Sequence, residues 1–319
     1  MFSYFGYTLM SQPILSIVVP TREGFAEHWL NELVKIKGDV EFILVHPPGM
    51  KKHPKVDERL QQINSSFRGE IIQRMTGMLN ASGKYLLTVN CDEYLTPDIV
   101  QIATDYFAAF PDSWVVRLSR NNFKFGDKSS LDKPWADFSQ LKSMPICPMS
   151  EDKKQETNLS YNAGNCLLEI PIAPLDTKFD FGCFFRTRKD HHGIHTENFD
   201  KKIWKNELLQ PTLQDILETM KIFGPVKYVP FWCLDRLLGL FIQAKFFKKG
   251  KIIGHLLPQP EQIRIEENPP EYKKSRRFYV FAEILLLRKF QNYGYLWNLI
   301  VDQIRGSLVR GFNFAFRRS

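Results

Sequence analysis

The sequence predicts a mixed α/β fold, in which helices flank a mainly parallel sheet, followed by a C-terminal helical extension. Short apolar, β-branched runs alternate with segments of helical spacing over residues 15–118. The first strand, helix and strand fall within about 30 residues, which is typical of a parallel βαβ unit. Helical periodicity dominates after residue 212. We therefore expect an α/β domain at residues 1–225 and a helical extension at residues 226–319.

Each expected element has a local signal. Residues 15–20 form an apolar run that ends at a proline, and residues 25–36 place Trp29, Leu30 and Leu33 at helical spacing. Pro97 suits the first turn of a helix that continues to residue 110. The expected strands cover residues 15–20, 40–45, 70–72, 85–89, 113–118 and 165–170. The expected helices cover residues 25–36, 75–81, 97–110, 212–222, 231–247 and 278–308, with an irregular connection at 121–160.

Composition separates a near-neutral body from a basic tail. The chain of 319 residues has a formal net charge of +8, and residues 241–319 alone carry 15 basic against 6 acidic residues. Five cysteines are scattered without a C-x-x-C pair, so the sequence indicates neither a zinc site nor a disulfide framework. A reducing cytoplasm is the expected compartment. No run of 18 apolar residues predicts a membrane-spanning helix.

The most informative segment is residues 81–98, where an apolar strand ends in polar and acidic residues. The strand at 85–89 is followed by Asn90, Asp92 and Glu93, and then by a helix that begins near Pro97. Ligands of open α/β sheets bind at the carboxyl ends of strands. A carboxylate there can hold Mg²⁺ or Mn²⁺, which take oxygen ligands and bridge to substrate phosphates. The alternative is that Asp92 only caps the turn.

Residues 81–98 resemble the Asp-x-Asp region of the family 2 glycosyltransferases. Ile17–Glu23 resembles that family's first strand and nucleotide loop, and Asn162–Asn165 and Lys178–Asp180 resemble its acceptor-side elements. The resemblance covers residues 14 to 205 in the family's order. It implies a GT-A-like fold and an inverting, metal-dependent transfer of a sugar, of hexosyltransferase type. The donor would be a nucleotide-sugar, and the acceptor a hydroxyl of a glycan or lipid-linked glycan for surface polysaccharide.

The resemblance also implies roles for individual residues. Asp92 would coordinate Mg²⁺ or Mn²⁺ on the nucleotide diphosphate. Glu93 would be a second metal ligand or an outer-shell partner, and His192 is a further candidate ligand. Thr21 and Glu23 would line the base and ribose pocket. The expected donor-binding residues are Pro20, Thr21, Arg22, Glu23, Arg74, Asn90 and Asp92. For Arg74, a solvated surface position is the alternative.

Two departures from the family pattern bear on the donor. Asn90 stands at the first acidic position of the motif and offers a neutral amide instead of a charge. The turn at Val45–Gly49 replaces the acidic, Ser-rich turn that reads uracil in the family. A UDP-sugar is still the favoured donor, although this second departure weakens the preference for uracil.

The catalytic base has no clean match in the sequence. Inverting transfer needs a carboxylate that takes the proton from the acceptor hydroxyl. Asp190 is the first candidate for this base and Glu197 the second, and both could instead lie in solvated loops. A cluster of histidines, His191, His192 and His195, lies between them. These imidazoles could complete the metal shell, contact the diphosphate or belong to an ordinary loop.

The basic, aromatic tail from residue 231 has three interpretations. Apolar helices with basic ends favour an anionic membrane surface, which would place the enzyme peripherally at the inner face of the membrane. A helical cap on the catalytic domain or an oligomer interface are the alternatives. No nucleic-acid partner is expected, because no recognised motif accompanies the charge.

Other functional classes compete with the transferase hypothesis. A non-catalytic sugar- or membrane-binding protein that retains the fold is kept open by Asn90 and by the unclear base. A nucleotidyltransferase is disfavoured, because it would show a Gly-rich, basic N-terminal loop that residues 20–24 do not supply.

Overall fold

The computed structural model describes most of the chain. The described residues are 12–25, 27–54, 56–135, 141–148, 166–188, 199, 201–220, 234–269 and 284–316, with backbone only at 220, 234 and 310–316. Among these residues, no helix is both long and apolar enough to cross a membrane.

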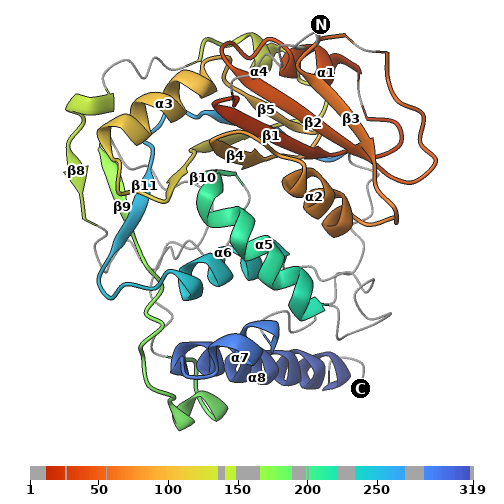
Figure 1. The fold of residues 1–319 in the computed structure, drawn as a ribbon. Helices are drawn as coiled ribbons and strands as arrows, with labels where there is room; N and C mark the ends of the chain where they lie inside the picture. Colours follow the sequence, from red (N-terminus) through yellow and green to blue (C-terminus); the bar gives the residue numbers. More distant parts are fainter. Residues whose placement is uncertain are drawn as a thin grey trace, which may run out of the picture.

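A nine-stranded mixed sheet forms the centre of the molecule (Figure 1). Its strand order is β3-β2-β1-β4-β10-β6-β11-β9-β8. In that order the strands are Leu60–Asn64, Val40–His46, Leu15–Pro20, Tyr85–Thr88, Lys202–Lys205, Val115–Arg117, Ile252–Leu256, Leu167–Pro171 and Ile146–Cys147. The first four strands are parallel, and β10 is antiparallel to both of its neighbours. A mixed, mainly parallel sheet is the fold class that the sequence predicts.

A second, three-stranded sheet continues from the strand β4. Its order is β5 (Glu93–Leu95), β12 (Ile263–Glu266) and β7 (Arg120–Phe123). The strand β12 is antiparallel to β5 and parallel to β7. This small sheet fixes the backbone immediately after the turn that carries Asp92, because Glu266 N–H donates to the Asp92 carbonyl at 2.9 Å.

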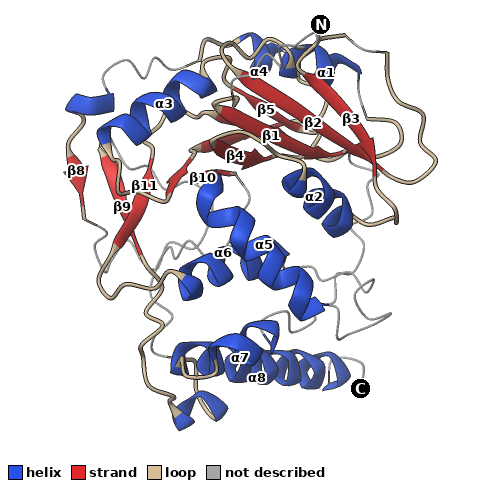
Figure 2. Ribbon diagram, viewed as in Figure 1, coloured by secondary structure: helices blue, strands red, loops and turns tan. Residues whose placement is uncertain are grey.

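Helices cover both faces of the large sheet (Figures 1 and 2). One face carries α1 (Glu27–Leu33) and α3 (Ile99–Ala109), and the other carries α2 (Glu70–Leu79), α5 (Asn206–Met220) and α6 (Leu234–Lys245). Beyond α5 and α6 lie α7 (Ile284–Phe290) and α8 (Gly294–Phe316). Short helical turns occur at α4 (Ser129–Asp132), η1 (Leu141–Ser143) and η3 (Phe181–Phe184).

Alternation along β1 explains why two cores form. Val18 faces the core with α2, whereas Ile17 and Val19 face the core with α1 and α3. A fully buried strand of this kind reads as a continuous apolar run, because helices cover both faces of a parallel sheet. Gly77 lets α2 approach β1 closely, since a Cβ at this position would come within 2.3 Å of the Val18 side chain.

The structure corrects several elements expected from the sequence. Glu70–Ile72 is not a strand but the first turn of α2, and the third parallel strand is β3 at residues 60–64. The connection at 121–160 contains β7, α4 and β8 in its described part. The single helix expected at 278–308 is divided, because α7 ends at Phe290 and α8 begins at Gly294. Cys147 of β8 forms a disulfide with Cys166, the residue before β9, which the cysteine spacing did not predict.

The expected helical extension also contributes strands. Within residues 226–319, β11 lies between β6 and β9 in the large sheet, and β12 lies between β5 and β7 in the small one. Neither strand was predicted. The expected extension therefore supplies one strand to each sheet, β11 at Ile252–Leu256 and β12 at Ile263–Glu266. The domain boundary at residue 225 stays a prediction.

Candidate active site

The candidate site lies where the order of the parallel strands reverses. The chain passes from β1 outward to β2 and β3, and then returns to place β4 on the other side of β1. The carboxyl ends of β1 and β4 therefore leave the sheet side by side and continue in different directions. Such a switch point is the general binding place for ligands in open α/β sheets.

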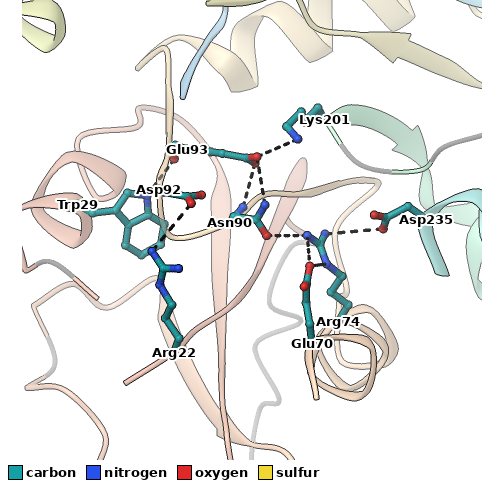
Figure 3. Close-up of polar contacts among 9 residues, drawn as sticks. All are labelled: Arg22, Trp29, Glu70, Arg74, Asn90, Asp92, Glu93, Lys201 and Asp235. Atoms are coloured by element: carbon teal, nitrogen blue, oxygen red, sulfur yellow. Dashed lines mark hydrogen bonds and ion pairs between the residues drawn. The ribbon is translucent and has the colours of Figure 1, made fainter. Parts of the chain in front are cut away.

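Asp92 and Arg22 face each other across this switch point (Figure 3). Arg22 follows β1, Asp92 follows β4, and the Arg22 Nη2 atom lies 4.0 Å from Asp92 Oδ2. The side chains of Arg22 and Asp92 are 53% and 27% exposed, so both can be reached by a ligand. Partial burial of the Asp92 carboxyl raises its pKa, and the neighbouring Glu93 carboxylate raises it further, while Arg22 lowers it. The ionised form of Asp92 would therefore gain from a cation nearby.

Glu93 stabilises the turn from the interior, and its side chain is 3% exposed. Its carboxylate pairs with Lys201 Nζ at 3.0 Å and accepts hydrogen bonds from the Asn90 backbone N–H at 3.0 Å and from Asn90 Nδ2 at 3.2 Å. Its own carbonyl accepts a hydrogen bond from the Trp29 indole at 2.9 Å. Lys201 has a φ of 56°, in the left-handed region that L-residues rarely adopt. These contacts fix the backbone on both sides of Asp92 (Figure 3).

Arg74 is buried under the same turn and is not a solvated surface residue. From α2, its guanidinium donates to Asn90 Oδ1 at 2.7 Å and to Glu70 Oε1 at 3.0 Å. Its Nη1 atom lies 3.9 Å from Asp235 of α6. Because Arg74 and Glu93 occupy both ends of the Asn90 amide, the orientation of that side chain is set by its hydrogen bonds.

The nucleotide loop that follows β1 divides into an inner and an outer part. The Thr21 hydroxyl is buried and lies 2.7 Å from His46 Nδ1, and Gln73 donates to the Thr21 carbonyl. Pro20 is buried at the end of β1. By contrast, Arg22 and Glu23 are exposed. The structure therefore places Arg22 and Glu23 where a ligand can reach them, and gives the Thr21 side chain an internal role.

The predicted catalytic base and the predicted histidine ligand fall in a part of the chain that the structure does not describe. Asp190, Glu197 and His192 lie between residues 189 and 198. The base and the third metal ligand therefore stay predictions. Sequence reasoning missed Lys201 and Asp235 as neighbours of the site, since each comes from an element far along the chain. The density of charge before β10 was visible in the sequence, but it did not indicate which lysine would face Glu93.

The described residues fit a divalent cation with a single protein carboxylate. Asp92 is a partly exposed carboxylate at the switch point, whereas Glu93 is buried and pairs with Lys201 and Asn90. No group of three His, Cys, Asp or Glu side chains with metal-binding geometry occurs among the described residues. Mg²⁺ and similar ions are often held by one or two carboxylates together with substrate phosphates and water. Asp92 suits this arrangement, whereas the Glu93 carboxylate already pairs with Lys201.

A mixed, mainly parallel sheet is the fold class that the sequence predicts, and the structure places a carboxylate at its switch point. Several solved structures align with most of this chain. Residues 1–349 of S. aureus TarS, in complex with UDP-GlcNAc, align with a TM-score of 0.48 at 14% identity, over 86% of this chain and 66% of that chain. The mannosyltransferase PcManGT from Pyrobaculum calidifontis, in complex with GDP-Man and Mn²⁺, aligns with a TM-score of 0.42 at 12% identity, over 95% of this chain and 76% of that chain.

The alignments cover only part of the TarS chains. The chain spans less than two thirds of the length of the TarS chains that it matches, down to 43% for the longest. No family model matches the sequence, and no curated protein matches it.

Proposed function

We propose that the protein is a metal-dependent, inverting glycosyltransferase that moves a sugar from a nucleotide-sugar, with a UDP-sugar favoured, to a hydroxyl of a glycan or lipid-linked glycan. The observation that carries the proposal is the position of Asp92. It is a partly exposed carboxylate at the switch point, its pKa is raised by burial, and the turn around it is fixed by an internal ion pair. A carboxylate so placed suits a cation that bridges to a diphosphate.

The roles of the neighbouring side chains follow from their exposure and partners. In the proposed complex, Asp92 would hold Mg²⁺ or Mn²⁺, which would supply positive charge beside the nucleoside diphosphate. Arg22 is exposed beside Asp92, so it is positioned to contact the same phosphates. Arg74 donates a hydrogen bond to Asn90 at 2.7 Å. We therefore propose that these two side chains position the turn and do not contact the donor directly.

Donor binding can be tested by thermal shift. Nucleotide-sugars such as UDP-GlcNAc and GDP-mannose, each with and without Mn²⁺, should raise the melting temperature of the wild-type protein, because a ligand of the native state stabilises it by mass action. We expect Asp92→Asn to abolish the Mn²⁺-dependent part of the shift. Asp98→Asn is the matched control, since Asp98 is an exposed aspartate just before α3 that pairs with Lys37 on the surface. An unchanged Mn²⁺-dependent shift in Asp92→Asn would refute the site.

Turnover separates the enzyme from a non-catalytic binding protein. We propose Asp190 as the base, with Glu197 as the second candidate and His192 as a further metal ligand. Asp190→Asn should lose sugar transfer to an acceptor and keep the donor-induced thermal shift, because a base acts on the acceptor hydroxyl. If Asp190→Asn keeps full activity, Glu197→Gln becomes the next variant. A wild-type protein that binds the donor and releases no nucleoside diphosphate with any acceptor would favour the binding protein.

A further inference from the structure

A cluster of exposed aromatic rings lies at the turn η3. The side chains of Phe181, Phe184 and Phe185 are 74%, 53% and 90% exposed. Phe179 packs between the first two, with ring centroids 4.8 Å from Phe181 and 6.3 Å from Phe184. Three large apolar side chains in five residues, all turned outward, are unusual on a monomer surface and mark an interaction site.

The turn that presents these rings is held by its own hydrogen bonds. Asp180 caps η3 by accepting from the Gly182 N–H at 2.8 Å, and it pairs with Arg186 at 2.9 Å. The Asp180 N–H donates to Asn298 Oδ1 of α8 at 2.7 Å, and Asn298 Nδ2 donates to the Lys178 carbonyl. The exposure of the phenylalanines is therefore built into the fold, since the backbone that carries them is tied to α8.

The helix α8 adds an apolar stripe beside the turn. Trp297, Ile304 and Leu308 are all exposed, and their spacing of seven and four residues places them on one face of the helix. Asn298, which binds the turn, directly follows Trp297. We call Phe181, Phe184, Phe185, Trp297, Ile304 and Leu308 together the aromatic face. In Figure 1 the turn and α8 lie at the end of the molecule farthest from the large sheet.

The charges around the aromatic face are mainly positive. Residues 176–188 and 284–309 contain six basic residues against three carboxylates; of the six, Arg188 is buried and Lys289 pairs with Asp215 of α5. Each of these carboxylates has a basic partner: Asp176 pairs with Lys249, Asp180 with Arg186, and Asp302 with Arg305. Lys178 and Arg288 are exposed in the same segments. Aromatic side chains surrounded by cations suit the interface of an anionic bilayer, where rings insert at the headgroup level and cations meet lipid phosphates.

We propose that the aromatic face is a membrane-docking surface, in which Phe181, Phe184 and Phe185 insert into an anionic bilayer and α8 lies along it. This inference goes beyond the proposed sugar transfer, because it depends only on the exposed rings and the charges near them. It also moves the membrane contact expected of the tail to a specific pair of elements, one of which, η3, precedes the tail by about 50 residues. Peripheral docking through a short aromatic turn needs no membrane-spanning helix.

The test is partition of the full-length protein onto vesicles. Wild-type protein should sediment with vesicles of phosphatidylcholine and phosphatidylglycerol, and much less with phosphatidylcholine alone. Phe184→Ser should weaken partition about tenfold, on the order expected for removing one inserted aromatic ring. Phe125→Ser is the matched control, because Phe125 has nearly the same exposure, 54% against 53%, and lies outside the aromatic face. It should partition like the wild type.

A second measurement does not depend on the folding of the Phe184 variant. Brominated lipids should quench the tryptophan fluorescence of the bound wild-type protein, and Trp297→Phe should remove most of that quenching. Equal loss of partition in Phe184→Ser and Phe125→Ser, or no binding of wild-type protein to anionic vesicles, would overturn the proposal. It would also be overturned by a wild-type dimer in solution that Phe184→Ser converts to monomers without any vesicle binding, since a second copy would then occupy the face.

Discussion

The ion pair between Lys201 and Glu93 offers the sharpest test of how the site is held. Replacement of Lys201 by Met keeps most of the aliphatic stem and removes the cation. The buried Glu93 carboxylate, which is 3% exposed, then keeps its hydrogen bonds from Asn90 without a counterion. Breaking a buried pair by removing one partner costs about 3 to 5 kcal/mol, whereas an exposed pair contributes up to about 1 kcal/mol. Lys201 is itself 19% exposed. We therefore expect Lys201→Met to lower the free energy of unfolding by about 3 kcal/mol.

Urea unfolding with linear extrapolation measures this loss. Lys35→Met is the control, because Lys35 pairs with Glu32 at 2.6 Å on the surface, with side chains 60% and 36% exposed, and its loss should cost less than about 1 kcal/mol. The double variant Lys201→Met, Glu93→Gln should recover about 2 kcal/mol, because a neutral amide no longer needs a cation. The reasoning fails if Lys201→Met costs no more than Lys35→Met, or if the double variant is less stable than Lys201→Met.

Two further predictions concern stability. Burial lowers the pKa of His255 to about 4, so the unfolded chain takes up a proton first as the pH falls below 6.5. The free energy of unfolding should then drop by about 2 kcal/mol from this group between pH 7 and pH 5. His255→Gln, which can still contact the Tyr106 hydroxyl, should show a shallower pH dependence in urea titrations, and an identical slope would contradict this. Gly77→Ala should destabilise the protein by about 2 kcal/mol despite the better helix propensity of Ala, because its Cβ would meet Val18 at 2.3 Å and Val45 at 3.0 Å. A melting temperature equal to or above that of the wild type would show that α2 can shift without cost.

The sequence predicted the parts of the fold that are buried and local. The strands β1, β2 and β4 are apolar on both faces, because helices cover both sides of the sheet, and such runs are visible in a single sequence. The edge strand β3, Leu-Gln-Gln-Ile-Asn, pairs only with β2 and is largely polar, so it gave no such signal. The apolar pair Ile71 and Ile72 predicts a strand at residues 70–72, whereas it belongs to α2, the helix that buries Met75 and Met78.

Strands that join the sheet from far along the chain could not be predicted. The strands β10, β11 and β12 each have four or five residues, and their pairing is set by partners about 80 to 170 residues away. Long sequence separation also limits how much of the candidate site can be predicted. Asp92 was found because it ends a local strand, but its relation to Arg22 and the pairing of Glu93 with Lys201 depend on distant elements meeting in space. Arg74, for which a solvated surface position was the alternative, is buried, and Asn90 and Glu70 accept hydrogen bonds from it.

The placement of β12 between β5 and β7 has a consequence for how the chain matures. Both partners of β12 are synthesised more than 130 residues before it, and until residue 266 has left the ribosome they have an open edge between them. A partly made chain therefore exposes unpaired strand edges until β12 has been made, which is the condition under which nascent proteins aggregate or need chaperones. The Glu266 backbone N–H donates to the carbonyl of Asp92, so the turn that carries Asp92 gains this hydrogen bond only after residue 266 has been made.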